Sequence, residues 1–354
     1  MKDPSFYDVI VDALDFGGQK DFSRFNDLEM IYLYIHEKKD LNDKNNRQKN
    51  TIEEYIRELL LFYKQLVENA VSFEIELEIL DYQLLKRLNE RNLRKYQDWL
   101  KTAPLGKGGK VYSAATKYRK TVIVKGFLKF LFEKDYIEHS LHKDMSSSNL
   151  HSSDIPIKEI SSEEVLHLIQ YFKNHPILYS LISTLATTGI RVNELCTATV
   201  GDLEYIDGEY WLTVKGKGNK FRQVLIHGNV LETIRKFRNR RRVDFHIGKR
   251  DESPLFITSK GKAYDSKYLS NYLIKKINQA DLEFVQMRKE PITPHTLRHG
   301  YAQISADQGA DLLTIQESLG HVQLKTTQRY LQRKTSRKRN AAHAWKNSEM
   351  LRNI

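Results

Sequence analysis

The chain has 354 residues, which is more than one small hydrophobic core supports, so two domains are the expected organisation. Lysine and arginine total 57 against 45 aspartate and glutamate residues, and the resulting formal charge of +12 favours a polyanionic partner. Hydrophobic residues make up 40% of the chain, enough to exclude global disorder, and the single cysteine, Cys196, excludes an intramolecular disulfide and a multi-cysteine metal site.

The amino-terminal residues 1–50 combine short apolar clusters with a polar run, and they predict a helical extension followed by a linker. The first residues, Met-Lys-Asp-Pro-Ser-Phe, lack the apolar core of a secretion signal. No stretch reaches the ~20 apolar residues that a helix needs to span a bilayer. We therefore expect a cytoplasmic protein that stays with the nucleoid and makes no membrane contact.

Residues 51–145 are expected to form a helical domain. A capping box from Thr51 to Glu54 predicts the start of one amphipathic helix, and apolar residues at helical spacing predict two more, over 84–100 and 113–136. Any one basic residue near the start of the third helix could equally lie on an ordinary solvated face. As a cluster they predict contacts with nucleic-acid phosphates, and they are Lys117, Arg119, Lys120 and Lys125.

A polar stretch over 146–159 has the composition of an interdomain linker, and residues 160–354 follow as the second domain. A capping box from Ser161 to Glu164 begins this domain, which is expected to be mostly helical. Two β-prone runs, 210–214 and 221–226, flank the stretch Lys-Gly-Lys-Gly-Asn-Lys. This pattern predicts a β-hairpin whose turn carries three lysines.

Three further stretches carry groups that suit the chemistry of a phosphodiester. A guanidinium group stays charged and presents a planar fork that matches phosphate oxygens, so a pair of arginines can neutralise the charge that develops when phosphorus is attacked. Each residue taken singly is more often structural, and only their joint occurrence carries the interpretation. In chain order they are Arg191 and Glu194, His295 and Arg298, and His321 followed nine positions later by Tyr330.

Together with the lysine-rich hairpin, these stretches resemble the tyrosine recombinases, a family that includes the phage integrases and the Xer and Cre enzymes. The resemblance covers about residues 51–335. It implies a mainly α-helical fold with a small β-hairpin or sheet. It further implies a two-domain, C-shaped clamp on DNA, made of a helical core-binding domain and a catalytic domain with a carboxy-terminal tail that docks on a neighbouring protomer.

The resemblance also implies a role for each candidate residue. Tyr330 would attack phosphorus and form a 3′-phosphotyrosyl intermediate, and His295 would act as the general base. The remaining catalytic candidates would act on the phosphate and the leaving group: Arg191 and Arg298 neutralise the phosphate, His321 donates a hydrogen bond to it, and Lys217 protonates the departing 5′ oxygen.

Some assignments rest on weaker patterns. Lys215 and Lys220 share the turn with Lys217 and are expected to contact DNA, while the Gly-Lys-Gly pattern favours Lys217 as the acid. Glu194 lies one helical turn after Arg191 and is expected to hold Arg191 or His295 in place rather than react. His299, next to Arg298, is a competing candidate because its imidazole could also face the site. It is interpreted as supporting structure, since successive helical residues point in different directions.

The resemblance implies site-specific recombination of double-stranded DNA, passing through a Holliday junction, without a metal or other cofactor. The expected assembly is a homotetramer on DNA and a monomer or weak oligomer when free, with accessory DNA-bending proteins as possible partners. It fits the integrase of a mobile genetic element as well as a resolution enzyme. The alternatives are a type IB topoisomerase, a catalytically silent DNA-binding regulator of the same fold, and, less favoured, a histidine-based metal nuclease.

Overall fold

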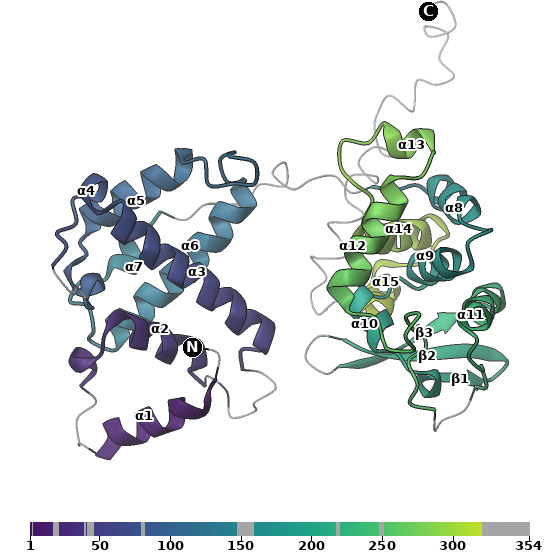
Figure 1. The fold of residues 1–354 in the computed structure, drawn as a ribbon, viewed down its shortest axis with the longest axis horizontal. Helices are drawn as coiled ribbons and strands as arrows, with labels where there is room; N and C mark the ends of the chain where they lie inside the picture. Colours follow the sequence, from purple (N-terminus) through teal and green to yellow (C-terminus); the bar gives the residue numbers. More distant parts are fainter. Residues whose placement is uncertain are drawn as a thin grey trace, which may run out of the picture. The chain divides into compact units, whose positions relative to one another are not determined.

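The computed structural model divides the chain into two compact units, Met1–Pro156 and Ile157–Ile354, each with its own hydrophobic core (Figure 1). The fold is mainly helical with one small sheet, which confirms the predicted class. Most of the linker expected at 146–159 lies outside the described residues. The structure describes residues 1, 3–16, 21–38, 40, 46–78, 82–146, 159–216, 220–247 and 251–320.

The core of the first unit includes a helix from the segment that the sequence predicts as an extension. Helix α2 (Asp27–His36) is buried over most of its length and contacts both α3 (Lys49–Glu68) and α6 (Ala114–Glu133). Residues 27–36 are therefore part of the core. The other elements of this unit are α1 (Ser5–Phe16), η1 (Phe22–Arg24), α4 (Ala70–Phe73), η3 (Leu84–Arg87), α5 (Glu90–Thr102) and α7 (Leu141–Asp144).

Two helix starts in this unit differ from the sequence prediction. Helix α3 begins at Lys49, so Thr51 lies inside the first turn, and Glu54 forms an ion pair with Arg119 instead of a capping box. The helix predicted over 84–100 is wrong in its first part, because η3 and α5 are separate elements. Asn89 caps α5 by accepting a hydrogen bond from the backbone of Asn92 at 3.0 Å.

The second unit is built around α9 (Pro176–Thr188), which contacts α8, α11, α14 and the sheet (Figure 1). The predicted capping box is confirmed at the start of α8, where Ser161 and Glu164 bond reciprocally. The other helical elements are α8 (Ser162–Tyr171), α10 (Val192–Thr197), η5 (Val200–Asp202), α11 (Gly228–Arg241), α12 (Ser266–Asn278), α13 (Glu283–Gln286), α14 (Pro294–Asp307) and α15 (Leu312–Leu319).

The sheet has three antiparallel strands in the order β1 (Leu203–Ile206), β2 (Glu209–Lys215) and β3 (Phe221–Ile226). The predicted hairpin, β2 and β3, is confirmed. Strand β1 was not predicted, although an Asp-Gly pair, a strong hairpin pattern, joins it to β2 with positive φ at both residues.

The register of the hairpin decides which side chains face the core. Leu212 pairs with Val224 and Val214 pairs with Arg222, and directly paired residues share one face of a sheet. Leu212, Val214 and Val224 are buried. Arg222 therefore lies on the inner face of the sheet among apolar side chains. In the described part of the chain, no helix is both long and apolar enough to cross a membrane.

Candidate active site

Arg191 lies at the amino-terminal cap of α10, where the chain turns sharply after α9. The turn is made by Gly189, whose φ of +62° is a left-handed conformation that favours glycine. The Arg191 backbone N–H donates to Oε2 of Glu194 at 2.7 Å, and its Nη1 donates to Oε1 at 2.7 Å. The Arg191 side chain is 38% exposed, so its charge is accessible from solvent.

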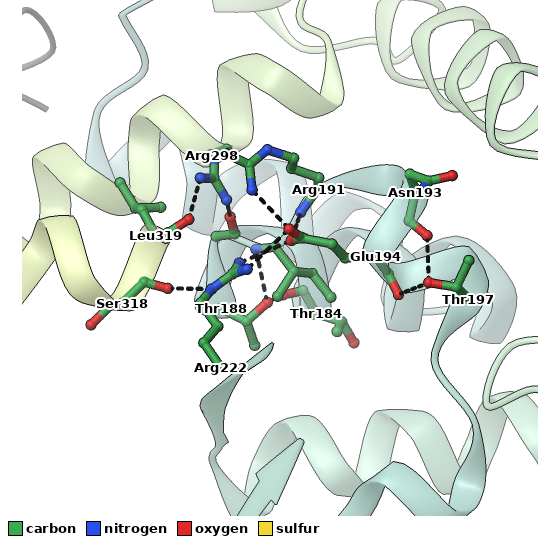
Figure 2. A network of polar contacts seen from close by, with 12 residues as sticks. Thr184, Thr188, Arg191, Asn193, Glu194, Thr197, Arg222, Arg298, Ser318 and Leu319 are labelled. Carbon is green, nitrogen blue, oxygen red and sulfur yellow. Dashed lines mark hydrogen bonds and ion pairs between the residues drawn. The ribbon is translucent and has the colours of Figure 1, made fainter. Parts of the chain in front are cut away.

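Glu194 is 2% exposed and is the hub of a network of polar contacts (Figure 2). Each carboxylate oxygen accepts one hydrogen bond from Arg191 and one from Arg222, the latter at 2.9 Å on both oxygens. Burial by itself raises the pKa of Glu194, but the hydrogen bonds from Arg222 and Arg191 outweigh it. The pKa is lowered, and Glu194 is a carboxylate at neutral pH.

Arg222 is a residue of this network that the sequence prediction missed. Its Nε donates to the backbone oxygen of Ser318 at 2.9 Å, while its two terminal nitrogens hold Glu194. The sequence does carry a pattern that marks this residue. In the strand β3, Arg222 occupies the same alternating position as the buried Val224 and Ile226, and a charged residue in a core-facing position requires a buried partner.

Arg298 lies on α14 and is 2% exposed. Its Nη1 donates to the backbone oxygen of Gly189, and its Nη2 donates to that of Leu319 at 2.5 Å (Figure 2). The helix starts firmly, because Thr293 and Thr296 form a capping box and Pro294 follows the cap. Arg298 thus joins the segment before Arg191 to the end of α15.

His295 and His299 form a pair on α14. Their ring centroids are 4.5 Å apart and the rings are at 78°, an edge-to-face arrangement. His295 is exposed and His299 is half-buried. His299 lies four residues after His295, a spacing that places the two rings on the same face of the helix. This contact suits the supporting role predicted for His299, and it places a second imidazole beside His295.

The end of the second hairpin strand approaches the same network. A Cβ on Gly216, which follows β2, would lie 3.4 Å from Oε1 of Glu194, so Gly216 lies close to the buried carboxylate. Glu194, Lys215 and Gly216 line one cavity of about 300 Å³. Lys215 and Lys220 are exposed. Three of the predicted catalytic residues, Lys217, His321 and Tyr330, lie outside the described residues.

The basic residues predicted in the first unit differ in their surroundings. Lys120 is buried and donates to Glu58 at 2.5 Å, which indicates a structural ion pair rather than a phosphate contact. Arg119 is exposed and paired with Glu54. Lys125 donates to the Met145 backbone oxygen at 3.1 Å, and Lys117 is half-buried.

Comparison with known proteins identifies the family of the chain. The family model described as the phage integrase family matches residues 158–337, about half of the chain. The chain is also 30% identical to tyrosine recombinase XerC of Thermodesulfovibrio yellowstonii, over 62% of this chain and 71% of the relative. The chain belongs to the phage integrase family.

Further relatives of this integrase extend the match. Tyrosine recombinase XerC of Syntrophus aciditrophicus is 26% identical over 88% of this chain and 91% of the relative. The structure of XerH recombinase bound to a palindromic difH substrate has a TM-score of 0.60 at 23% identity, covering 80% of this chain and 79% of that one. A lambda integrase dimer bound to a COC′ core site has a TM-score of 0.60 at 14% identity, covering 86% and 77%. The two structures show that the fold is shared.

These findings confirm the resemblance inferred from the motifs. This chain is a tyrosine-type site-specific DNA recombinase. The comparisons do not favour a topoisomerase or a catalytically silent regulator.

Proposed function

We propose that this recombinase cleaves and rejoins DNA at a site built around Arg191 and Arg298, with Tyr330 as the nucleophile. The observation that supports it is a pair of hydrogen-bonded clusters that meet at neighbouring residues of the chain. One cluster joins Arg191 through Glu194 and Arg222 to the Ser318 backbone, and the other joins Arg298 to the backbones of Gly189 and Leu319, immediately before the Gly-His motif. The two clusters bring Arg191 and Arg298, which are 107 residues apart in sequence, to the same two segments of the chain, and this shared anchoring supports a common site.

The proposed cleavage step exchanges one phosphodiester for another. The Tyr330 oxygen bonds to phosphorus while the bond to the 5′ oxygen breaks, and the tyrosine remains linked to the 3′ phosphate. His295 takes the phenolic proton, and Lys217 gives a proton to the departing 5′ oxygen. Attack by a 5′ hydroxyl reverses both transfers. No bond energy is lost, so rejoining needs no nucleotide.

The two arginines and His321 act on the phosphate itself. Negative charge builds on the non-bridging oxygens during attack, and preorganised guanidinium groups stabilise that charge. Arg191, anchored by Glu194 yet accessible, is suited to such a contact. Arg298 acts from the base of the site, and His321 adds a hydrogen bond.

The proposed partners are two double-stranded DNA sites, exchanged one strand at a time through a Holliday junction by a homotetramer. A crystal structure of lambda integrase as a tetramer on such a junction has a fold similar to this chain, with a TM-score of 0.60. Residues 51–145 would bind DNA opposite the catalytic domain, with Lys117, Arg119, Lys125, Lys215 and Lys220 on phosphates. We place the free enzyme in the cytoplasm at the nucleoid, as a monomer or weak oligomer that accessory DNA-bending proteins assist.

The biological setting that we propose is the integration or excision of a mobile genetic element, or the resolution of a chromosome or plasmid. The tail that follows Tyr330 would dock on a neighbouring protomer. Deletion of residues 340–354 is then expected to leave single-site DNA binding intact and to weaken cooperative assembly in gel shifts; unchanged cooperativity would refute the docking role.

The test of the proposed reaction is covalent capture. Fragmented genomic or element DNA is incubated with the enzyme, and the covalently bound ends are recovered under denaturing conditions and sequenced. Tyr330→Phe should abolish the adduct and preserve binding, whereas Tyr205→Phe, at an exposed tyrosine of β1, should retain both. Arg191→Ala should lower cleavage by about 10³–10⁵-fold, the effect of losing a phosphate-stabilising cation. An adduct formed by the Tyr330→Phe variant at the wild-type rate would show that the nucleophile is another residue.

A further inference from the structure

Arg222 is placed to act on Arg191 through the carboxylate that the two residues share. Its two terminal nitrogens each donate to one oxygen of Glu194 at 2.9 Å, which is the bidentate geometry of a strong arginine–carboxylate pair. The Arg222 side chain is 12% exposed and that of Glu194 is 2% exposed. The pair is therefore shielded from water, where such contacts are stronger than at the surface.

The charges in this cluster make Arg222 more than a packing residue. Glu194 carries one negative charge, and Arg191 and Arg222 carry one positive charge each, so the cluster retains a net positive charge. With Arg222 in place, the buried carboxylate has a full counterion besides Arg191. Without Arg222, Arg191 would be the main counterion of a desolvated carboxylate. Its guanidinium group would then turn toward Glu194, and the carboxylate would cancel more of its positive charge.

Arg222 is itself held on two sides. The strand β3 fixes its backbone, and the bond from its Nε to the Ser318 oxygen fixes its side chain against the end of α15. A Cβ on Gly320 would lie 3.1 Å from Cδ of Arg222, so the chain after α15 passes directly over the guanidinium stem. Glu194 is therefore held by a guanidinium group whose own position is fixed by β3 and by the end of α15.

We propose that Arg222 is a positioning residue that, by neutralising and orienting Glu194, keeps Arg191 directed at the scissile phosphate. The inference rests on the proposed function. Arg222 hydrogen-bonds Glu194 and the Ser318 backbone, and its proposed role requires no contact with DNA. Loss of Arg222 should therefore slow cleavage for the same reason as a weakened contact between Arg191 and the phosphate.

The experiment compares two substrates that differ in charge at one phosphate. Duplexes carrying the captured site are made with an ordinary scissile phosphodiester, or with a methylphosphonate in which a methyl group replaces one non-bridging oxygen, each diastereomer separately. The methylphosphonate is neutral, so it needs less cationic stabilisation. Arg222→Gln should slow single-turnover cleavage of the phosphodiester by about 10²-fold, the effect of a misplaced group at a reacting centre.

The expected result is that this deficit shrinks by about tenfold or more on at least one methylphosphonate diastereomer, because the charge that Arg191 neutralises is then absent. Arg222→Lys keeps the charge and loses the fork, so it should lie between Gln and wild type and serves if the Gln variant does not fold. The matched control is Arg238→Gln. Arg238 is also buried in this unit, but it donates to the backbone oxygens of Asp244, Pro254 and Leu255. Its variant should lose stability and show no dependence on the substrate.

Equal deficits on the two substrates for folded Arg222 variants would overturn the inference and leave the proposed function intact. A wild-type chain that forms no adduct would overturn the proposed function and, with it, this inference. A double-variant cycle gives an independent readout: if Arg222 acts through Glu194, then adding Arg222→Gln to Glu194→Gln should lower cleavage much less than Arg222→Gln does alone. Additive losses in the cycle would also contradict it.

Discussion

Replacement of Gly189 by alanine tests whether the turn between α9 and Arg191 is as tightly packed as the structure describes. The φ of +62° is left-handed, which costs an L-residue about 1–2 kcal/mol. An added Cβ would also lie 2.6 Å from Cδ1 of Tyr301 and 2.8 Å from Cδ2 of Leu319. Forcing a methyl group into such a contact costs about 1–3 kcal/mol. Gly189→Ala should therefore destabilise the second unit by about 2–5 kcal/mol.

The matched control is Gly261→Ala in the same unit. Gly261 has a φ of +71°, but nothing lies within 4 Å of its added Cβ, so it carries the backbone cost without the steric one. The effect of alanine on the unfolded chain is shared by both variants and cancels in the comparison. Urea unfolding of the full chain, with hydrogen exchange of peptides from α9 and α14 to report on this unit, should separate the variants by about 1–3 kcal/mol. Equal destabilisation would refute the close packing of Gly189.

The same substitution should impair catalysis. The Gly189 carbonyl accepts a hydrogen bond from Arg298, and Arg191 follows two residues later. A displacement of this turn moves both arginines, and a shift of about 1 Å at a reacting group lowers a rate by about 10²-fold. Covalent-adduct formation should fall accordingly in Gly189→Ala and stay near wild type in Gly261→Ala.

Two further predictions concern the first unit. Lys120→Met should destabilise it by about 1–3 kcal/mol, because Glu58 loses one of two cationic partners and keeps the more exposed Arg57. The salt dependence of DNA binding should not change in this variant, whereas Lys117→Ala should lower the slope of log K against log salt by about one with little change in stability; a smaller slope for Lys120→Met would contradict the structural role. Burial raises the pKa of Asp27 to about 6 from 3.8, so its contribution to stability is full below pH 3.8 and is lost as pH rises through 6. The stability of Asp27→Asn relative to wild type should therefore increase as pH rises from about 4 to about 7, with a total increase of at most about 3 kcal/mol. If urea unfolding gives parallel curves of stability against pH for the two proteins, Asp27 is not buried as described.

The parts of the fold that the sequence predicted correctly are those set by local chemistry. The box at Ser161 and Glu164 forms because both partners lie within one turn, and the hairpin forms because the lysine-rich turn separates two strands of matching alternation. Local patterns failed where tertiary contacts competed for the same side chain. Glu54 had the spacing for a capping box, yet it pairs with Arg119, which is 65 residues away.

The residues of the candidate site also fall into those that local motifs identify and those that only the fold reveals. Motifs identified Arg191, Glu194 and Arg298 because these residues lie in short stretches with a recognisable order. Arg222 belongs to no such stretch, and its partners Glu194 and Ser318 are 28 and 96 residues away in sequence. The alternation of β3 marks Arg222 as a core-facing residue, but its partners Glu194 and Ser318 can be identified only in the three-dimensional fold.

Arg298 has a structural role that its sequence motif does not reveal. Gly189 caps the end of α9 and Gly320 caps the end of α15, and the carbonyls that Arg298 binds belong to Gly189 and Leu319, at the carboxy-terminal ends of these two helices. Such ends carry partial negative charge and oxygens without a helical partner, so a cation there stabilises the fold as well as any bound phosphate. Under the proposed function, a cleavage defect in an Arg298 variant would therefore combine a loss of structure with a loss of phosphate stabilisation. Arg191, which is 38% exposed and anchored by Glu194, separates the two effects more cleanly, and the catalytic contribution of the guanidinium pair is best measured there.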